Sequence, residues 1–466
     1  MMFKNDEYIR RRELLSPKFS SGILLFLGNE ESPVNFLHNT YRFRQDSSFL
    51  YYFGIQKPGL AAIIDVDQQL VILFGDEMSI DDIVWMGRQK TLKENAFEAG
   101  ILEVRPKSEL ANYISKALNT NRSVHFLPPY RAENKIMLAT LFNVAPEQVS
   151  GLASVPFIKA IVAQRSVKSE IELYEIDKAV STSVDMQLLA MKMARPGMKE
   201  SEIAAAIHQV ALNGGGDLAY PIILTINGQI LHNHFHGNTL KDGDLVLNDS
   251  GAETQMGYAG DLTRTFPVGK TFNSLQKEVY NIVLAAYYDA AKLLKPGLQY
   301  LDVHRRACLT LAEGLKAMGL MKGNLEDAVS RGAHALFFQC GTGHMMGLDV
   351  HDMEDLGEQY VGYSDKLVKN TSQFGLKSLR LGKELEVGNV LTVEPGIYFI
   401  PELIDMWAEE GTFSEYINYE KVKEFRSFGG IRIEDDFVIT TEGSRKLGKP
   451  LAITVEEVEA VRGTIF

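Results

Sequence analysis

Five residues of types that ligate metals lie in apolar or glycine-rich segments of this sequence. Asp249 and Asp261 each stand beside a strand-like segment, in LVLNDSGAE and GYAGDLTRTF. An antiparallel strand pair would place their carboxylates side by side, although an aspartate beside Ser-Gly is by itself usually a turn former. Glu394, in VLTVEPGIY, and Glu434, in GGIRIEDDFVI, interrupt β-like apolar runs. A carboxylate in such a run is expected to be buried, and it stays charged there only beside a cation.

The fifth residue is His344, in CGTGHMMGLDVHD, a segment that also contains His351. The spacing of seven residues is too long for two ligands on one helical turn, so the two histidines are predicted to have different roles. Taken alone, either histidine would more often have a structural role. Arg432 lies two residues before Glu434, on the same face of a strand. This arginine is either the ion-pair partner of Glu434 or a neighbour of a metal ligand.

The charges of these five residues balance those of two metal ions. Two divalent cations carry four positive charges, which four carboxylates and one neutral imidazole cancel. Such a pair of cations acidifies a bound water molecule and activates it, which predicts hydrolysis. Oxygen-rich ligation with a single imidazole favours hard or borderline ions. Manganese (Mn²⁺) is the first expectation, with cobalt, zinc or iron as alternatives.

The elements that must position these residues form two regions. A chain of 466 residues suggests two domains, one of them large. Short apolar runs between polar or glycine-containing turns predict strands, and a helix is predicted over residues 109–118. The strands are predicted at residues 23–27, 49–53, 60–64 and 70–74. These elements indicate a mixed α/β amino-terminal domain over residues 1–165.

All the candidate ligands fall in the second region, residues 166–466. A capping box of Ser169 and Glu172 begins a predicted pattern of helix, Pro-Gly and helix over residues 169–212. Strands are predicted to follow at residues 222–226 and 245–247. The pattern of helix, Pro-Gly and helix returns over residues 275–301. The recurrence suggests an internal duplication, although Pro-Gly is also common punctuation after a helix.

The composition excludes several classes of partner. A formal net charge of −12 argues against nucleic acid or an anionic membrane, which need a basic face. No apolar run approaches the roughly 18 residues of a membrane span, and residues 1–12 are polar where a signal peptide is apolar. Cys308 and Cys340 are too few for a disulfide framework and have no zinc or redox spacing. We therefore expect a cytoplasmic protein in a reducing compartment.

With its motifs in the order Asp, Asp, His, Glu and Glu, the sequence resembles the M24 metallopeptidases, in the branch of aminopeptidase P and prolidase. The resemblance covers nearly the whole chain, because residues 41–53 and 85–88 are similar to that branch's first domain and residues from about 165 onward to its catalytic domain. It implies an α/β chain in which a smaller mixed α/β domain precedes a pseudo-duplicated catalytic domain of the pita-bread fold. The implied reaction is hydrolysis of the bond between an N-terminal residue and a following proline.

The resemblance also implies a metal-binding role for each acidic candidate. The residues that would hold two divalent metal ions are Asp249, Asp261, His344, Glu394 and Glu434. Asp261 would bridge the two ions. Glu394 would also take the proton of the attacking water and pass it towards the leaving nitrogen.

Further roles follow from the resemblance for residues that do not ligate metal. His232, in ILHN, would contact the substrate, and His351 would steady the scissile carbonyl as it gains negative charge. Arg432 would lie behind the last glutamate. His234 and His236 have no counterpart in the family and are expected in an exposed loop.

The sequence departs from the family pattern at three places. The two aspartates are twelve residues apart where eleven are expected, and the extra residue is assigned to a turn within residues 254–258. Cys340 stands four residues before His344, where the branch usually has a histidine, although it could simply be a small buried residue. Residues 398–431 resemble prolidase more than the shorter loop of bacterial aminopeptidase P, yet Tyr419 stands about where a prolidase would have the arginine that holds a dipeptide's free carboxylate.

The last of these departures, the missing arginine at Tyr419, favours an aminopeptidase P, which accepts longer peptides, over a prolidase, which requires dipeptides. The expected substrates are peptides with proline at the second position. A homodimer or homotetramer is expected through the amino-terminal domain, where Trp85 would reach a neighbouring subunit's active site or be a core tryptophan. Two other classes on this scaffold, metal-free creatinase relatives and binding proteins with a relic site, have lost ligands that are present here.

Overall fold

The structure is a computed structural model that describes residues 3–464, and the chain divides into two compact units. The first comprises Met1–Arg165 and Met353–Tyr360, and the second comprises Ser166–Asp352 and Val361–Phe466. The outermost ends of the two predicted domains, residues 1–2 and 465–466, lie outside the described part. Within residues 3–464, no helix is long and apolar enough to cross a membrane.

The first unit is built on a five-stranded sheet in the order β6-β5-β4-β1-β7. Its strands are β1 (Ile23–Leu27), β4 (Ala61–Asp65), β5 (Leu70–Phe74), β6 (Glu103–Arg105) and β7 (Val124–His125). The three central strands are antiparallel, whereas β6 and β7 pair in parallel at the two edges. Inward side chains such as Ile23, Ile63 and Phe74 form the core against α5.

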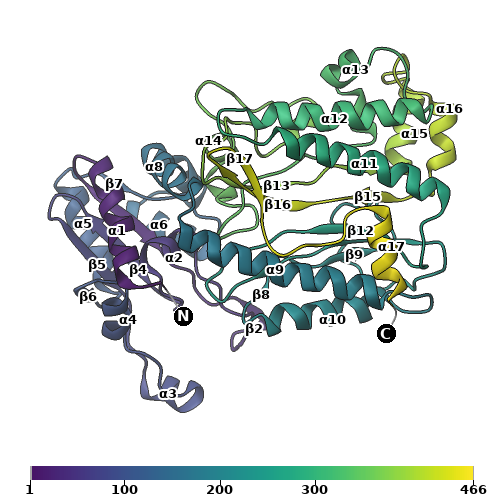
Figure 1. Cartoon of the computed structure of the whole chain (residues 1–466). Helices are drawn as coiled ribbons and strands as arrows, with labels where there is room; N and C mark the ends of the chain where they lie inside the picture. Colours follow the sequence, from purple (N-terminus) through teal and green to yellow (C-terminus); the bar gives the residue numbers. More distant parts are fainter. Residues whose placement is uncertain (1–2, 465–466) are drawn as a thin grey trace. The chain divides into compact units, whose positions relative to one another are not determined.

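Helices and one small hairpin complete the first unit (Figure 1). They are α1 (Asn5–Leu15), α2 (Ser47–Phe53), α3 (Ile80–Met86), α4 (Leu92–Glu98), α5 (Glu109–Asn119), α6 (Ala132–Phe142), α7 (Pro146–Val149), α8 (Val155–Ser166), β2 (Pro33–Phe36) and β3 (Asn39–Thr40). On α3, Trp85 is 86% exposed, and Ile80 and Val84 are also exposed. The alternative of a core tryptophan is therefore wrong.

One predicted strand is a helix. Residues 49–53 belong to α2, which begins where the Asp46 carboxylate accepts the N–H of Phe49 and ends at Gly54 in the left-handed conformation (φ 65°). All seven residues of α2 are buried. A short apolar run that is buried on every side has no period to distinguish strand from helix, so only its end signals could have identified it.

The second unit places pairs of helices on opposite sides of its strands (Figure 1). Its helices are α9 (Glu170–Met193), α10 (Glu200–Asn213), α11 (Ser274–Leu293), α12 (Tyr300–Ala317), α13 (Leu325–Arg331), α15 (Pro401–Glu410), α16 (Tyr419–Val422) and α17 (Val455–Gly463). The short α14 (Glu358–Val361) lies where the chain passes from the first unit to the second. The predicted capping box of Ser169 and Glu172 begins α9.

Two three-stranded antiparallel sheets carry the residues of interest, in the orders β12-β10-β9 and β13-β16-β17. Two further pairs join β14 with β15 and β8 with β11. The strands are β8 (Asp217–Leu218), β9 (Ile223–Thr225), β10 (Leu245–Asp249), β11 (Ala252–Glu253), β12 (Thr263–Pro267), β13 (Val390–Val393), β14 (Gly396–Tyr398), β15 (Gly430–Arg432), β16 (Asp435–Thr440) and β17 (Gly443–Lys446). A single bridge between Thr263 and Glu434 connects β12 to the segment that precedes β16.

The two halves of this unit are built alike. In each half a long helix, α9 or α11, is followed by Pro-Gly and a second helix, α10 or α12. The residue before that second helix forms an isolated β-bridge to a residue that lies shortly before a strand, β10 or β13. The bridges join Lys199 to Thr239 and Gln299 to Glu384. The predicted duplication and the predicted α/β fold class are thus confirmed.

The segment between the two aspartates is a turn, as predicted. The N–H of Thr254 donates to the carbonyl of Tyr258, and Gly257 adopts a positive φ of 85°. β10 and β12 pair in continuous register, with Asp249 opposite Thr263. The turn therefore does not shift either strand by one residue, a shift that would point its side chains to the other face of the sheet.

Candidate metal centre

The four candidate carboxylates lie at or near strand ends, and His344 lies in a loop, in both halves of the second unit. Asp249 is the last residue of β10, and Asp261 comes two residues before β12. Glu394 directly follows β13, and Glu434 lies between β15 and β16. His344 lies in a loop that is held beside β13, because its carbonyl accepts the N–H of Thr392. The pairing of the strands thus brings side chains from positions 249 to 434 close together in space.

The ligand atoms converge. Asp261, His344 and Glu434 offer atoms that lie within 4.8 Å of one another. The Nε2 atom of His344 is 3.4 Å from Asp261 Oδ2 and 3.6 Å from Glu394 Oε1. The Tyr220 hydroxyl lies 2.6 Å from Asp249 Oδ1 and 2.5 Å from Asp261 Oδ1, and so links the fifth residue to the others. The side chains are buried or nearly so, with Glu394 the most open at 18%.

The orientation of His344 suits a metal ligand. Its Nδ1 lies 3.1 Å from the carbonyl of Met345, which fixes the proton on that nitrogen. The other nitrogen, Nε2, then presents its lone pair to the carboxylates. A ring held in this tautomer needs no reorganisation to bind a cation.

The buried carboxylates have too little positive charge around them. Burial raises the pKa of Glu394 to about 7 and that of Glu434 well above its ordinary range, and the neighbouring aspartates add to both shifts, although Arg432 opposes them. Burial also raises the pKa of Asp249, against the opposing charge of Arg432. For Asp261 burial acts in the same direction, but the hydrogen bond and charge of His344 outweigh it and lower the pKa. Oxygen donors crowded in this way fit divalent cations, whose charge would offset the repulsion.

Arg432 does not pair with Glu434, the partner that its spacing first suggests. Its Nη2 donates to Asp249 Oδ2 at 2.5 Å, and its Nη1 donates to the Tyr398 hydroxyl at 2.8 Å. Glu434 instead accepts a hydrogen bond from the Thr263 hydroxyl at 2.6 Å. Arg432 therefore orients one predicted ligand, and Thr263 orients another.

The predicted substrate-contacting histidines lie near this cluster. The ring of His351 is 4.3 Å from that of His344, measured between centroids. His232 lies in an exposed loop. The part of its side chain that is shielded from water lowers the pKa of the imidazole, and the charge of the nearby Asp249 opposes that shift. His234 is exposed as expected, whereas His236 is half-buried with its Nε2 3.1 Å from the carbonyl of Ile222. For His236 the exposed-loop expectation is wrong, because the ring binds the backbone.

The other two departures from the family pattern differ in their surroundings. Cys340 is partly buried, and burial together with the charge of Glu394 raises the pKa of its thiol to about 12. This thiol is therefore neutral and close to a predicted ligand. The Tyr419 hydroxyl donates to the carbonyl of Thr412, within its own loop.

Sequence reasoning missed several residues that hold the site together. Tyr220, in the irregular segment before β9, touches both aspartates. Asp436 accepts the backbone N–H of Asp261 at 2.9 Å. The sequence does show Asp436 as an acidic residue two positions after Glu434. No pattern around Tyr220 predicts that Tyr220 contacts the two aspartates.

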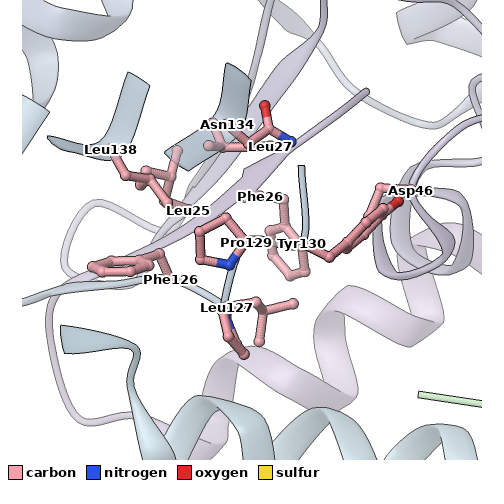
Figure 2. Close-up of a pocket in the computed structure, with 11 residues that line it drawn as sticks. Leu25, Phe26, Leu27, Asp46, Phe126, Leu127, Pro129, Tyr130, Asn134 and Leu138 are labelled. Carbon is pink, nitrogen blue, oxygen red and sulfur yellow. The ribbon is translucent and has the colours of Figure 1, made fainter. Parts of the chain in front are cut away.

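A separate pocket lies in the first unit (Figure 2). It has a volume of about 40 Å³, and its lining is mainly apolar, with Leu25, Phe126 and Leu138 among the residues. The Asp46 carboxylate at its edge accepts the N–H of Phe49 and caps α2. Its size and lining suit packing in a core better than chemistry.

We expect Mn²⁺ to bind more tightly at pH 8 than at pH 6. Because the pKa of Glu394 is raised to about 7, this carboxyl is mostly protonated at pH 6 and ionised at pH 8. A cation must displace that proton at the lower pH, which weakens binding roughly tenfold for Glu394 alone. Titration calorimetry in two buffers of different ionisation enthalpy measures both the affinity and the released protons. An affinity that is constant from pH 6 to pH 8 would contradict this account.

Two family descriptions match the chain. Metallopeptidase family M24 matches residues 175–441, which is more than half of the chain, and the amino-terminal domain of aminopeptidase P matches residues 8–125. The first match contains every predicted ligand.

Individual relatives carry two different activity names. The Xaa-Pro dipeptidase of Homo sapiens is 31% identical over 98% of this chain and 92% of its own length. The Xaa-Pro aminopeptidase of Escherichia coli (strain K12) is 29% identical over 98% of this chain and 97% of its own length.

Solved structures agree over the whole length. Aminopeptidase PepP of Pseudomonas aeruginosa has a TM-score of 0.80 at 26% identity and covers 99% of this chain and 98% of its own. Zinc-substituted E. coli aminopeptidase P in complex with product has a TM-score of 0.78 at 28% identity, covering 99% of both chains. The resemblance predicted from the motifs is thus confirmed, and the chain belongs to metallopeptidase family M24, in the branch that holds aminopeptidase P and prolidase.

Proposed function

We propose that this hydrolase cleaves the bond between an N-terminal residue and a following proline, with two divalent metal ions, Mn²⁺ first, as its cofactor. The observation that carries the proposal is the convergence of the five predicted ligands in one buried cluster. When bound there, the ions would supply an acidified water molecule and an electrophile for the scissile carbonyl.

The protein's own side chains supply the proton transfers in this proposal. Glu394, with a pKa raised to about 7 by burial before any cation binds, is placed to accept the proton of the attacking water and deliver it to the proline nitrogen. A bond to proline is a tertiary amide without an N–H, and, as in any amide hydrolysis, its nitrogen must be protonated before it leaves. His351, beside His344, would donate to the carbonyl oxygen as it gains charge, and His232 would hold the substrate.

Arg432 acts through other residues in this proposal. Its bond to Asp249 fixes the carboxylate, and its bond to Tyr398 fixes the guanidinium in turn. A guanidinium held at both ends cannot swing into the substrate site. Arg432 is therefore a positioning residue.

Longer peptides are the proposed substrates, ahead of dipeptides alone. Tyr419, where a prolidase arginine was expected, uses its hydroxyl on the Thr412 carbonyl and offers no positive charge for a dipeptide's free carboxylate. The relatives do not decide the matter, because dipeptidase and aminopeptidase names occur at nearly the same identity. A strict Xaa-Pro dipeptidase is the alternative.

Parallel assays of an Xaa-Pro dipeptide and an Xaa-Pro-Yaa tripeptide test the choice. With Mn²⁺ added, we expect the tripeptide to be cleaved at the Xaa-Pro bond with a kcat/KM at least about tenfold above the dipeptide's, a difference of about 1.4 kcal/mol in transition-state binding. Xaa-Ala-Yaa serves as the control for proline preference. Cleavage of the dipeptide alone would establish the alternative, and cleavage of neither would contradict both.

We further propose that the chain forms a homodimer or homotetramer. The exposed apolar side chains of α3, Ile80, Val84 and Trp85, support this because such a cluster is unfavourable in water. Light scattering gives the number of subunits directly.

A further inference from the structure

A second group of metal-ligating side chains lies apart from the carboxylate cluster. His304 and Cys308 are one turn apart on α12, and His334 lies in the 3-10 helix Ala333–Leu336. Their ligand atoms lie within 4.8 Å of one another. The residues are almost fully buried, with exposures of 1%, 0% and 3%.

The pair on α12 already has the geometry of two ligands on one ion. Cys308 Sγ lies 3.5 Å from His304 Nε2. Zinc bonds of roughly 2.3 Å to sulfur and 2.0–2.1 Å to nitrogen, at a tetrahedral angle, separate the two ligand atoms by about 3.5 Å. The other ring nitrogen of His304, Nδ1, lies 2.8 Å from the Thr342 hydroxyl. An outer hydrogen bond of this kind orients an imidazole that binds metal through Nε2.

His334 has no satisfied role in the protein alone. Among the described residues, neither of its ring nitrogens meets the geometry of a hydrogen bond. The Val329 carbonyl is close enough to raise its pKa slightly, but burial dominates and lowers the pKa to about 4. A buried, neutral imidazole with two unused nitrogens calls for a partner, and a lone pair at this place is suited to a cation.

The cluster is reachable from outside. A cavity of about 420 Å³ is lined by all three residues and extends past Glu326, Ser330 and Asn370. It is large enough to admit a hydrated ion and to leave room for water as a fourth ligand.

We propose that His304, Cys308 and His334 form a second metal site for a zinc-class ion, with its fourth position open to the cavity. A thiolate with two imidazoles favours zinc, cobalt or a similar borderline ion over manganese, which prefers oxygen. The site is thus chemically distinct from the carboxylate cluster. Binding converts the Cys308 thiol to a thiolate and releases one proton to solvent, so that charge and atoms balance.

This site would also steady the carboxylate centre. Thr342, which binds His304 through its hydroxyl, accepts the backbone N–H of Glu394 with its carbonyl at 2.8 Å. The same carbonyl accepts the hydroxyl of Tyr300, from the same helix as His304. An ion on α12 would therefore restrain the loop that leads to His344.

Cobalt binding to the full chain tests the proposal, since a Co²⁺ ion with a thiolate ligand has a sulfur-to-metal charge-transfer absorption that carboxylate sites lack. We expect one thiolate-bound Co²⁺ per chain in the parent protein, and the absorption to be absent in Cys308→Ser. Cys340→Ser is the matched control, because Cys340 is the other cysteine of the chain and is not in the cluster; it should keep the absorption. In His334→Gln the Co²⁺ affinity should fall by more than the roughly 10–100-fold that loss of an outer hydrogen bond costs.

A second measurement separates binding from folding. Because Zn²⁺ can also replace Mn²⁺ in the carboxylate cluster of every variant, the test is the difference between variants: in protein first saturated with Mn²⁺, Zn²⁺ should raise the thermal unfolding temperature of the parent and of Cys340→Ser by more than that of Cys308→Ser. Circular dichroism of each metal-free variant verifies its fold. No absorption in the parent, its survival in Cys308→Ser, or its loss in Cys340→Ser only would overturn the proposal.

Discussion

Replacing Asp261 by alanine is expected to abolish both metal retention and peptidase activity. Of the four carboxylates in the candidate cluster, Asp261 is the one whose pKa is lowered despite burial, because His344 forms a hydrogen bond with it. It is therefore the carboxylate most ready to meet a cation, and its ligand atoms lie with those of His344 and Glu434. Loss of the several kcal/mol that a metal contributes to the transition state predicts a fall in kcat/KM of at least about 1,000-fold.

The same substitution is expected to have little effect on the stability of the metal-free protein. Asp261 raises the pKa of Glu394, of Glu434 and of Asp436 by charge repulsion. Its removal relieves that repulsion but also breaks the contacts with His344 and Tyr220, so the chelated variant should unfold at a temperature close to that of the chelated parent. This result would show that inactivity comes from the lost ligand and not from a damaged fold.

Elemental analysis after dialysis and a peptide assay with added Mn²⁺ measure the loss. Asp185→Ala is the matched control, because Asp185 is an exposed aspartate of the same unit that forms a surface pair with Lys449. It should retain metal and activity. Near-normal turnover in Asp261→Ala would refute the assignment of this residue.

The candidate ligands could be selected from the sequence because each is an unusual residue type for the apolar or glycine-rich segment around it. A carboxylate inside an apolar β-like run, as at Glu394 and Glu434, is costly unless it has a function. Their partners could not be predicted in the same way. Arg432 binds Asp249, 183 residues away, and Tyr220 touches Asp261, 41 residues away. Such contacts depend on how the two halves pair, which no local pattern encodes.

The cluster of His304, Cys308 and His334 shows the same limit. Cysteine spacing alone gave no sign of zinc, and two of the ligands share only one turn of α12. The third ligand arrives through α13, which ends at Gly332 in the left-handed conformation (φ 94°) and turns the chain back towards α12. This reversal of the chain direction brings His334 next to His304 and Cys308.

Arg264 joins the two halves of the second unit and contacts the backbone of the candidate ligand Glu434. Its side chain is fully buried and donates to the carbonyls of Thr263, Glu434 and Ala452. Its Nη2 is 2.9 Å from Asp435 Oδ1, in a pair that is completely shielded from water. Arg264 lies three residues after the candidate ligand Asp261, and Asp435 directly follows the candidate ligand Glu434. The ion pair therefore fixes how the two segments that carry these ligands meet.

Arg264→Met is therefore expected to lower the free energy of unfolding by about 3–5 kcal/mol, the cost of removing one partner from a buried ion pair. Lys446 and Tyr287 also contact Asp435, at 2.7 Å and 2.6 Å, which places the loss towards the lower end of that range. Urea denaturation with chelator present measures it without metal linkage.

Arg445→Met provides the matched control, since it makes the same substitution in a pair with Asp177 that is 49% and 32% exposed. An exposed pair contributes about 0–1 kcal/mol, so the two variants should differ by at least about 2 kcal/mol. If the pair also aligns the ligands, Arg264→Met should bind Mn²⁺ more weakly while Arg445→Met should not. Equal losses of stability in the two variants would mean that burial adds nothing to the Arg264–Asp435 pair.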